Sequence, residues 1–147
     1  MARSAGKRLA LELMPLSLVG GTEGFLRLLK EPGLGELAYN FDTGHAWARK
    51  ERVELIPALV GNAIVGTHLC DNQGNENLKL RPGAGSLDFP ALLAALEANG
   101  YAGSYDLEIS CRPENLDAEY RRGRDAICEL LLATSRRTSR PQRQAKG

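Results

Sequence analysis

Short apolar runs alternate with amphipathic stretches along most of this 147-residue chain. Each run is bounded by Gly, Pro or Asn and is shorter than a typical helix, so the runs are predicted to be β-strands. The stretches between them have the apolar spacing of helices. We therefore expect strands at 9–14, 37–42, 63–69 and 103–109, and helices at 22–30, 53–60, 89–98 and 117–133.

Polar and helix-breaking residues mark where these helices should begin and end. Thr22, Asp88 and Asp117 are each placed to cap the first turn of a helix. The pairs Pro32-Gly33 and Asn99-Gly100 should end the first and third helices. A strand–helix alternation of this length implies βαβ units, and hence an α/β fold with a parallel sheet and flanking helices.

Composition is that of a globular domain, with 43% hydrophobic and 25% charged residues. No apolar run approaches the roughly 18–20 residues that span a bilayer, so we expect no membrane partner. The basic start of the chain is followed by a stretch that contains Glu12 and breaks at Pro15, unlike a signal peptide. We predict a cytoplasmic protein with a basic leader (1–8), one folded domain (9–133) and a basic, disordered tail (134–147).

The net charge of +1 conceals an uneven distribution. The tail has five basic residues and no acidic one, which leaves 14 basic and 18 acidic residues, a charge of −4, in the rest of the chain. A folded body of that sign argues against nucleic acid as a partner. The three cysteines form no CxxC pattern and are expected to be reduced thiols.

A metal-ligating or ionisable side chain lies near the C-terminal end of every predicted strand. These side chains are Glu12, Asp42, His68 and Glu108, and His45 follows the second strand closely. The C-terminal ends of parallel strands lie side by side, so we expect the side chains to converge. An O/O/O/N donor set suits one divalent cation, with Mg²⁺, Mn²⁺, Co²⁺ and Zn²⁺ as candidates. Without a cation, burying three carboxylates together would cost several kcal/mol.

Five motifs in this order resemble the second half of the xylose-isomerase-like TIM barrels. That superfamily includes sugar-phosphate isomerases and epimerases, and also AP endonucleases of the endonuclease IV type. The resemblance covers about residues 9–132 and implies the C-terminal half, strands 5–8, of a (βα)₈ barrel. The motifs are FDTGHA at 41–46, THLCDNQG at 67–74, PGAGSLDF at 82–89, GYAG at 100–103 and LE at 107–108.

The resemblance also implies a function for the converging side chains. In the isomerases of this superfamily one divalent metal is bound by Glu, Asp, His and Glu, which match Glu12, Asp42, His68 and Glu108. Glu12 and Glu108 would be the catalytic pair that moves a proton beside a carbonyl through an enediolate. His45 would contact the substrate or approach the metal. The expected function is that of a metal-dependent sugar or sugar-phosphate isomerase or epimerase.

The chain departs from the family pattern at two places. Many members have an Asp-x-His pair before the Gly-x-Gly turn, and the nuclease branch uses it to bind additional zinc. Here Asn77 and Lys79 take those places, which counts against the AP endonuclease alternative. The ketose 3-epimerases also have an Arg shortly after the histidine that matches His68, and this chain has none there. Lys79 and Arg81 remain as candidates to bind a substrate phosphate or carboxylate.

Three further residues near the expected site are open to two interpretations. Trp47 could stack on a sugar face or cover the rim of the barrel. Asp71 and Asn72 could contact substrate or support the ligands from behind.

The chain is too short to form the whole barrel that the expected function needs. A closed (βα)₈ barrel needs about 250 residues, so the first and last strands would have unpaired edges. We expect a truncated product, or a half-barrel that pairs with a second copy or with a separate N-terminal half. The alternative function is a non-catalytic half-barrel that needs a partner. The sugar is not identified by the sequence.

Overall fold

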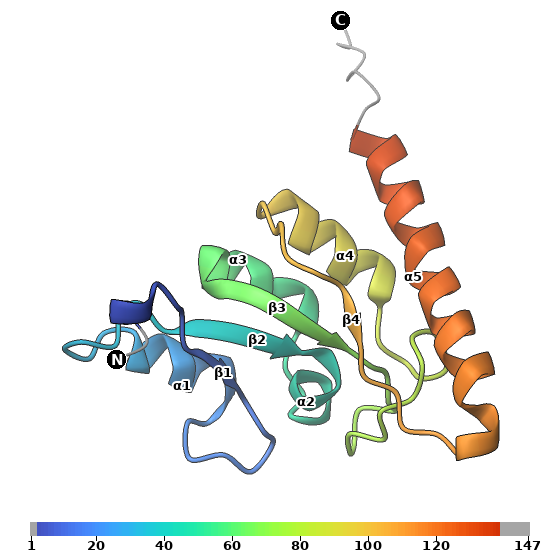
Figure 1. Ribbon diagram of the computed structural model, residues 1–147, viewed down its shortest axis with the longest axis horizontal. Helices are drawn as coiled ribbons and strands as arrows, with labels where there is room; N and C mark the ends of the chain where they lie inside the picture. The colour runs from blue at the N-terminus through green and yellow to red at the C-terminus, as the bar shows by residue number, and fades with distance from the viewer. Residues whose placement is uncertain (1–2, 139–147) are drawn as a thin grey trace, which may run out of the picture.

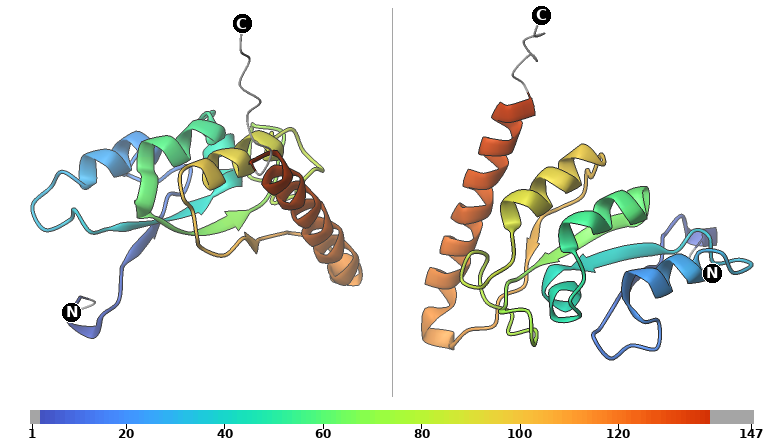
Figure 2. Two further views of the ribbon diagram at one scale, coloured as in Figure 1. Left: turned by 90° about the horizontal axis from the view of Figure 1, so that it is seen from above. Right: turned by 180° about the vertical axis from the view of Figure 1, so that it is seen from behind.

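The computed structural model describes residues 3–138, and it contains one sheet of four strands in chain order (Figure 1). Every neighbouring pair is parallel, which confirms the predicted α/β fold. The main helices lie on one face of this sheet, as Figure 2 shows from above. The strands are β1 (Ala10–Glu12), β2 (Ala38–Asp42), β3 (Ile64–Leu69) and β4 (Asp106–Leu107).

Five α-helices connect and follow the strands. They are α1 (Gly21–Leu28), α2 (Thr43–Ala48), α3 (Ile56–Val60), α4 (Phe89–Ala98) and α5 (Leu116–Thr138). Short 3₁₀ turns are η1 (Arg3–Ala5), η2 (Val53–Leu55), η3 (Gly61–Ala63) and η4 (Pro113–Asn115). Helix α2 was not expected, and it begins directly where β2 ends.

The hydrophobic core lies between the sheet and its helices. Alternate side chains of β2 point into it, because successive strand residues face opposite sides of a sheet. Tyr39 and Phe41 are both buried, and Tyr39 stacks at a tilt on Phe25 of α1 with ring centroids 5.2 Å apart. Helix α4 adds three fully buried leucines, Leu92, Leu93 and Leu96. The residues between these positions in the strands face the opposite side of the sheet, where the polar site lies.

The caps expected from the sequence are correct at one helix and wrong at two. Asp88 caps α4 by accepting a hydrogen bond from the backbone N–H of Ala91 at 3.0 Å. Helix α1 instead begins after Gly20, whose positive φ of 73° suits glycine, so Thr22 lies inside the helix. Asp117 also lies inside its helix, because the chain enters α5 through a 3₁₀ turn.

The last strand is much shorter than the expected 103–109. Local hydrogen bonds compete with strand pairing just before β4. The Tyr101 hydroxyl donates to the carbonyl of Ser104 at 2.5 Å, and the Ser104 hydroxyl donates to Asp106 at 2.6 Å. Only Asp106–Leu107 then pairs with β3.

The ends of the chain are described in part. Helix α5 continues beyond the expected boundary at 133 as far as Thr138. The rest of the expected tail, and the first two residues of the expected leader, lie outside the described residues. Between residues 3 and 138, no helix is both long enough and apolar enough to cross a membrane.

Candidate metal centre

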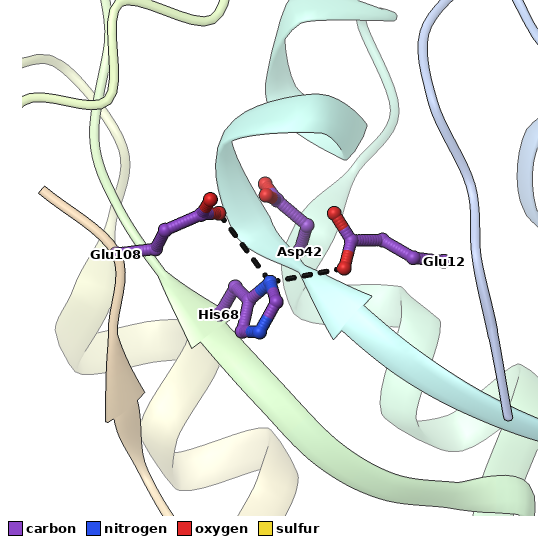
Figure 3. Close-up of side chains that lie close together, drawn as sticks. All are labelled: Glu12, Asp42, His68 and Glu108. Carbon is purple, nitrogen blue, oxygen red and sulfur yellow. Dashed lines mark ion pairs between the residues drawn. The ribbon is translucent and has the colours of Figure 1, made fainter. Parts of the chain in front are cut away.

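Four side chains meet at the C-terminal ends of the four strands, on the face of the sheet opposite the main helices. The candidate ligand atoms of Glu12, Asp42, His68 and Glu108 all lie within 4.8 Å of one another. Figure 3 shows the His68 ring between the two glutamates, with Asp42 beside them. The His68 Nδ1 atom is 3.0 Å from Glu12 Oε2 and 3.3 Å from Glu108 Oε2. The structure therefore brings together all four residues that the sequence suggested as ligands.

Asp42 has two roles in this arrangement. Its Oδ1 atom accepts a hydrogen bond from the backbone N–H of His45 at 2.7 Å and so caps helix α2. Its Oδ2 atom is buried and makes no hydrogen bond within the described part of the chain, although it lies 3.5 Å from His45 Nε2. The same holds for Glu108 Oε2, which lies 3.3 Å from His68 Nδ1. Buried carboxylate oxygens without a partner are costly. Two such oxygens beside a glutamate and an imidazole fit a divalent cation as their common partner.

Burial and charge separate the pKa values of these carboxyl groups. Burial raises the pKa of Asp42 to about 6, and the nearby Glu108 carboxylate adds to this, whereas His45 opposes it. Burial also acts to raise the pKa of Glu108, but the hydrogen bond and charge of Lys79 outweigh it, so the pKa of Glu108 lies below its ordinary value. Glu108 is thus the more readily ionised of the two.

Asn40 is a site residue that the sequence reasoning missed. Its amide Nδ2 donates to Glu12 Oε2 at 3.0 Å and lies 3.3 Å from His68 Nε2. Asn40 is two residues before Asp42 on β2, on the strand face opposite the core residues. That spacing was the signal that could have found it, since alternate strand positions share a face. Asn40 holds Glu12 in place beside His68.

His45 is almost fully buried, at 4% exposure, next to two of the expected ligands. Its Nε2 atom is 3.5 Å from Asp42 Oδ2 and 3.6 Å from Glu12 Oε1. Its Nδ1 atom is 3.0 Å from the amide Nδ2 of Asn77. His45 thus borders the cluster from helix α2 without being one of the four converging ligands.

The two basic candidates for substrate binding lie in different places. The Lys79 ammonium contacts Glu108 Oε1 and therefore lies at the edge of the cluster. Arg81 instead forms an ion pair with Glu119 of α5, with Nε 3.1 Å from Oε2. The structure brings Lys79 to the site and directs Arg81 toward the last helix, and the role of each in substrate binding stays a prediction.

Trp47, Asp71 and Asn72 all have structural contacts. The Trp47 indole N–H donates to the Ser86 hydroxyl at 3.2 Å. Asp71 is fully buried and accepts hydrogen bonds from backbone N–H groups. Asn72 is also fully buried, and its amide donates to the carbonyl of Gly44 at 2.9 Å. Asp71 and Asn72 fix the loop beside the site, and stacking of Trp47 on a sugar stays a prediction.

Comparison with known proteins finds relatives in sequence and in fold. MJ1311, an uncharacterised protein of Methanocaldococcus jannaschii, is 31% identical over 113 residues, which cover 74% of this chain and 39% of that protein. The fold matches a D-tagatose 3-epimerase-like protein with a TM-score of 0.80 and 23% identity, over 94% of this chain and 52% of the other. An L-ribulose 3-epimerase matches with a TM-score of 0.81 and 22% identity, over 99% and 54%.

These matches assign the fold and the family. The chain spans about half the length of the two epimerase structures, which agrees with the expected half-barrel. The family model described as xylose isomerase-like TIM barrel matches residues 1–130. The resemblance noted in the sequence is therefore confirmed, and the chain belongs to the xylose isomerase-like TIM barrel family.

Proposed function

We propose that this chain is the metal-binding half of a sugar or sugar-phosphate isomerase or epimerase. The observation that carries the proposal is the convergence of Glu12, Asp42, His68 and Glu108 within 4.8 Å at the C-terminal ends of four parallel strands. That edge is where α/β barrels place their active sites. The fold similarity to sugar epimerases supports the same choice of substrate class.

The four side chains would hold one divalent ion, with Mn²⁺, Mg²⁺, Co²⁺ and Zn²⁺ all suited to the donor set. When bound, the ion would polarise the substrate carbonyl and stabilise negative charge on its oxygen. Asn40 keeps Glu12 oriented, and Lys79 holds Glu108 from the other side.

Proton transfer would be carried by Glu12 and Glu108. Glu12 ends β1 and Glu108 directly follows β4, and the two lie on opposite sides of His68, at 3.0 and 3.3 Å (Figure 3). Two carboxylates that flank a bound substrate can act on its two faces. One would remove the proton from the carbon beside the carbonyl, and the other would return a proton to the opposite face.

Substrate contacts are proposed for the residues around the ligands. His45 and Lys79 border the cluster directly. Lys79 is the better candidate for an anionic group such as a phosphate, because its ammonium group lies at the cluster while Arg81 is paired with α5. Trp47 would stack on a sugar face or cover the rim of the barrel.

A second half-barrel is proposed to complete the wall around the site. Strands β1 and β4 are the outer strands of the described sheet, and Leu9 beside β1 is 58% exposed. Open strand edges of this kind are sites of pairing with another strand. The partner would be a second copy of this chain or an N-terminal half-barrel, in the cytoplasm. Light scattering of the purified chain, alone and mixed with a candidate N-terminal half, distinguishes the two.

Metal binding is the first test of the proposal. Titration calorimetry with Mn²⁺ should detect one binding site, and Glu12→Gln and Glu108→Gln should each weaken binding by at least tenfold. Glu76→Gln is a matched control, because Glu76 is an exposed acid on a nearby loop and its loss changes the charge by the same amount. Absence of Mn²⁺, Co²⁺ and Mg²⁺ binding would remove the basis of the proposal.

Turnover is the second test. A panel of ketoses and their phosphates incubated in D₂O should exchange the proton beside the carbonyl, and the exchange should stop in Glu12→Gln and Glu108→Gln. Metal binding without exchange, in the completed assembly, would favour the non-catalytic half-barrel. Metal-dependent cleavage at abasic sites in DNA would instead establish the nuclease alternative, against which Asn77 and Lys79 argue.

A further inference from the structure

Asn77 is held in one orientation by its neighbours. Its side-chain oxygen Oδ1 accepts a hydrogen bond from the backbone N–H of Lys79 at 3.1 Å. A backbone N–H can only donate, so the amide oxygen and not the amide nitrogen must face it. The approach to Gly44 is also close, since a Cβ atom at that glycine would collide with Asn77 Oδ1. The amide nitrogen of Asn77 must therefore point the other way.

That nitrogen faces His45 and decides which ring nitrogen carries the proton. Asn77 Nδ2 lies 3.0 Å from His45 Nδ1. An amide NH₂ group can only donate, so Nδ1 must accept with its lone pair. In a neutral imidazole the proton then resides on Nε2. Nε2 is buried, has no hydrogen-bond partner within the described residues, and lies 3.5 and 3.6 Å from Asp42 Oδ2 and Glu12 Oε1.

We propose that Asn77 is a positioning residue that keeps the proton on His45 Nε2, so that His45 presents a hydrogen-bond donor to the site and does not bind the metal. A ring nitrogen that carries a proton has no lone pair for a metal ion. The ligand set is then limited to Glu12, Asp42, His68 and Glu108. The inference rests on the proposed function in one respect, because the donor faces Asp42 and Glu12, which that proposal assigns as metal ligands.

An aspartate at position 77 would reverse this arrangement. Its carboxylate would still accept from the N–H of Lys79, but toward His45 it could only accept. Nδ1 would then carry a proton and donate it to the carboxylate. Metal-bound histidines commonly donate their other ring N–H to a carboxylate in this way. Whether residue 77 presents an oxygen or an NH₂ group to His45 thus decides the state of Nε2. With an NH₂ group, Nε2 carries a hydrogen-bond donor, and with an oxygen, Nε2 has a lone pair for a metal ion.

Nitrogen NMR of the metal-free protein tests the inference without any assay of activity. The chain has two histidines, so loss of one set of ring signals in His45→Gln assigns the His45 signals. At about pH 8, where imidazole is ordinarily neutral, we expect His45 Nδ1 to be unprotonated and Nε2 to be protonated. A protonated Nδ1 in the wild type would overturn the proposal, whatever the variants show.

Two variants and one titration extend the test. Asn77→Asp should give a protonated Nδ1, whereas Asn75→Asp, the same change at an exposed position of the same loop, should leave the His45 signals unchanged. An unchanged Nδ1 in folded Asn77→Asp would contradict the proposal. One equivalent of Zn²⁺ should shift the His68 ring signals and leave the proton on His45 Nε2. Loss of that proton would show that His45 binds the metal and would contradict the proposal. If Zn²⁺ shifts neither histidine, the proposed metal site fails while the metal-free spectrum still decides the role of Asn77.

Discussion

Asp71 is a fully buried carboxylate that accepts four backbone hydrogen bonds. Its Oδ1 atom accepts from Asn72 at 2.8 Å and from Leu87 at 3.1 Å. Its Oδ2 atom accepts from Gly83 at 3.0 Å and from Gly85 at 2.9 Å. These bonds join the start and the end of the segment 72–87, which lies beside the candidate metal centre. The substitution Asp71→Asn would place an NH₂ group against two of these N–H donors.

The expected loss of stability follows from this count. A hydrogen bond to a charged group contributes about 1.5–3 kcal/mol, so loss of the two bonds to one carboxylate oxygen should cost about 3–6 kcal/mol. That is a large part of the ordinary free energy of unfolding, which is about 5–15 kcal/mol. Because the segment carries both Asn77 and Lys79, the affinity for Mn²⁺ should fall in the same variant.

Urea unfolding followed by circular dichroism measures the effect. Asp88→Asn is the matched control, because Asp88 makes one exposed capping bond to Ala91 and asparagine caps helices equally well. We expect that control to change the free energy of unfolding by less than about 0.5 kcal/mol. If Asp71→Asn costs no more than the control, the four bonds do not hold the segment, and the reasoning is refuted.

Three further predictions follow from contacts around the site. Because the Asp42 carboxyl has a pKa of about 6 and must lose its proton to bind a metal, the Mn²⁺ affinity should fall as the pH drops below about 6. Calorimetry from about pH 5 to 8 checks this, and an affinity independent of pH would contradict it. Gly44→Ala should displace Asn77, since the new Cβ would collide with Asn77 Oδ1, and should lower both the melting temperature and the Mn²⁺ affinity; unchanged values would contradict the tight packing. Arg81→Ala should cost no more than about 1 kcal/mol, because its ion pair with Glu119 is partly exposed, and should leave the Mn²⁺ affinity unchanged; a large loss of affinity would place Arg81 in the site.

The strands and their ligands could be predicted because their signals are local. Each short apolar run is complete within a few residues, and each ends close to its ligand, as Asp42 ends β2 and His68 lies near the end of β3. The parallel order then follows from the connections, and the convergence of the ligands follows from the parallel order. Helix α4 and its cap at Asp88 were predictable for the same reason.

The parts that escaped prediction depend on contacts between distant segments. For Asp71 the sequence left open both substrate contact and support of the ligands, because its backbone partners Gly83 and Gly85 are more than ten residues away and leave no local pattern. The pairing of Asn77 with His45 also joins two loops. Helix α2 is the exception, since Asp42 followed by His45 three residues later is the spacing of a capping interaction and could have indicated it.

The two outer strands are the shortest of the sheet, with three residues in β1 and two in β4. Glu12 ends β1 and Glu108 directly follows β4, so both strands position a glutamate of the cluster. Short strands at a sheet edge open and close more readily than central ones. An ion held by Glu12 and Glu108 would link the outer strands β1 and β4 to the inner strands. A free ion concentration of a hundred times the dissociation constant would oppose this opening by about 2.7 kcal/mol. In such a sheet the metal would hold the two outer strands in place, so that binding of the ion and ordering of the strand backbone become one coupled equilibrium.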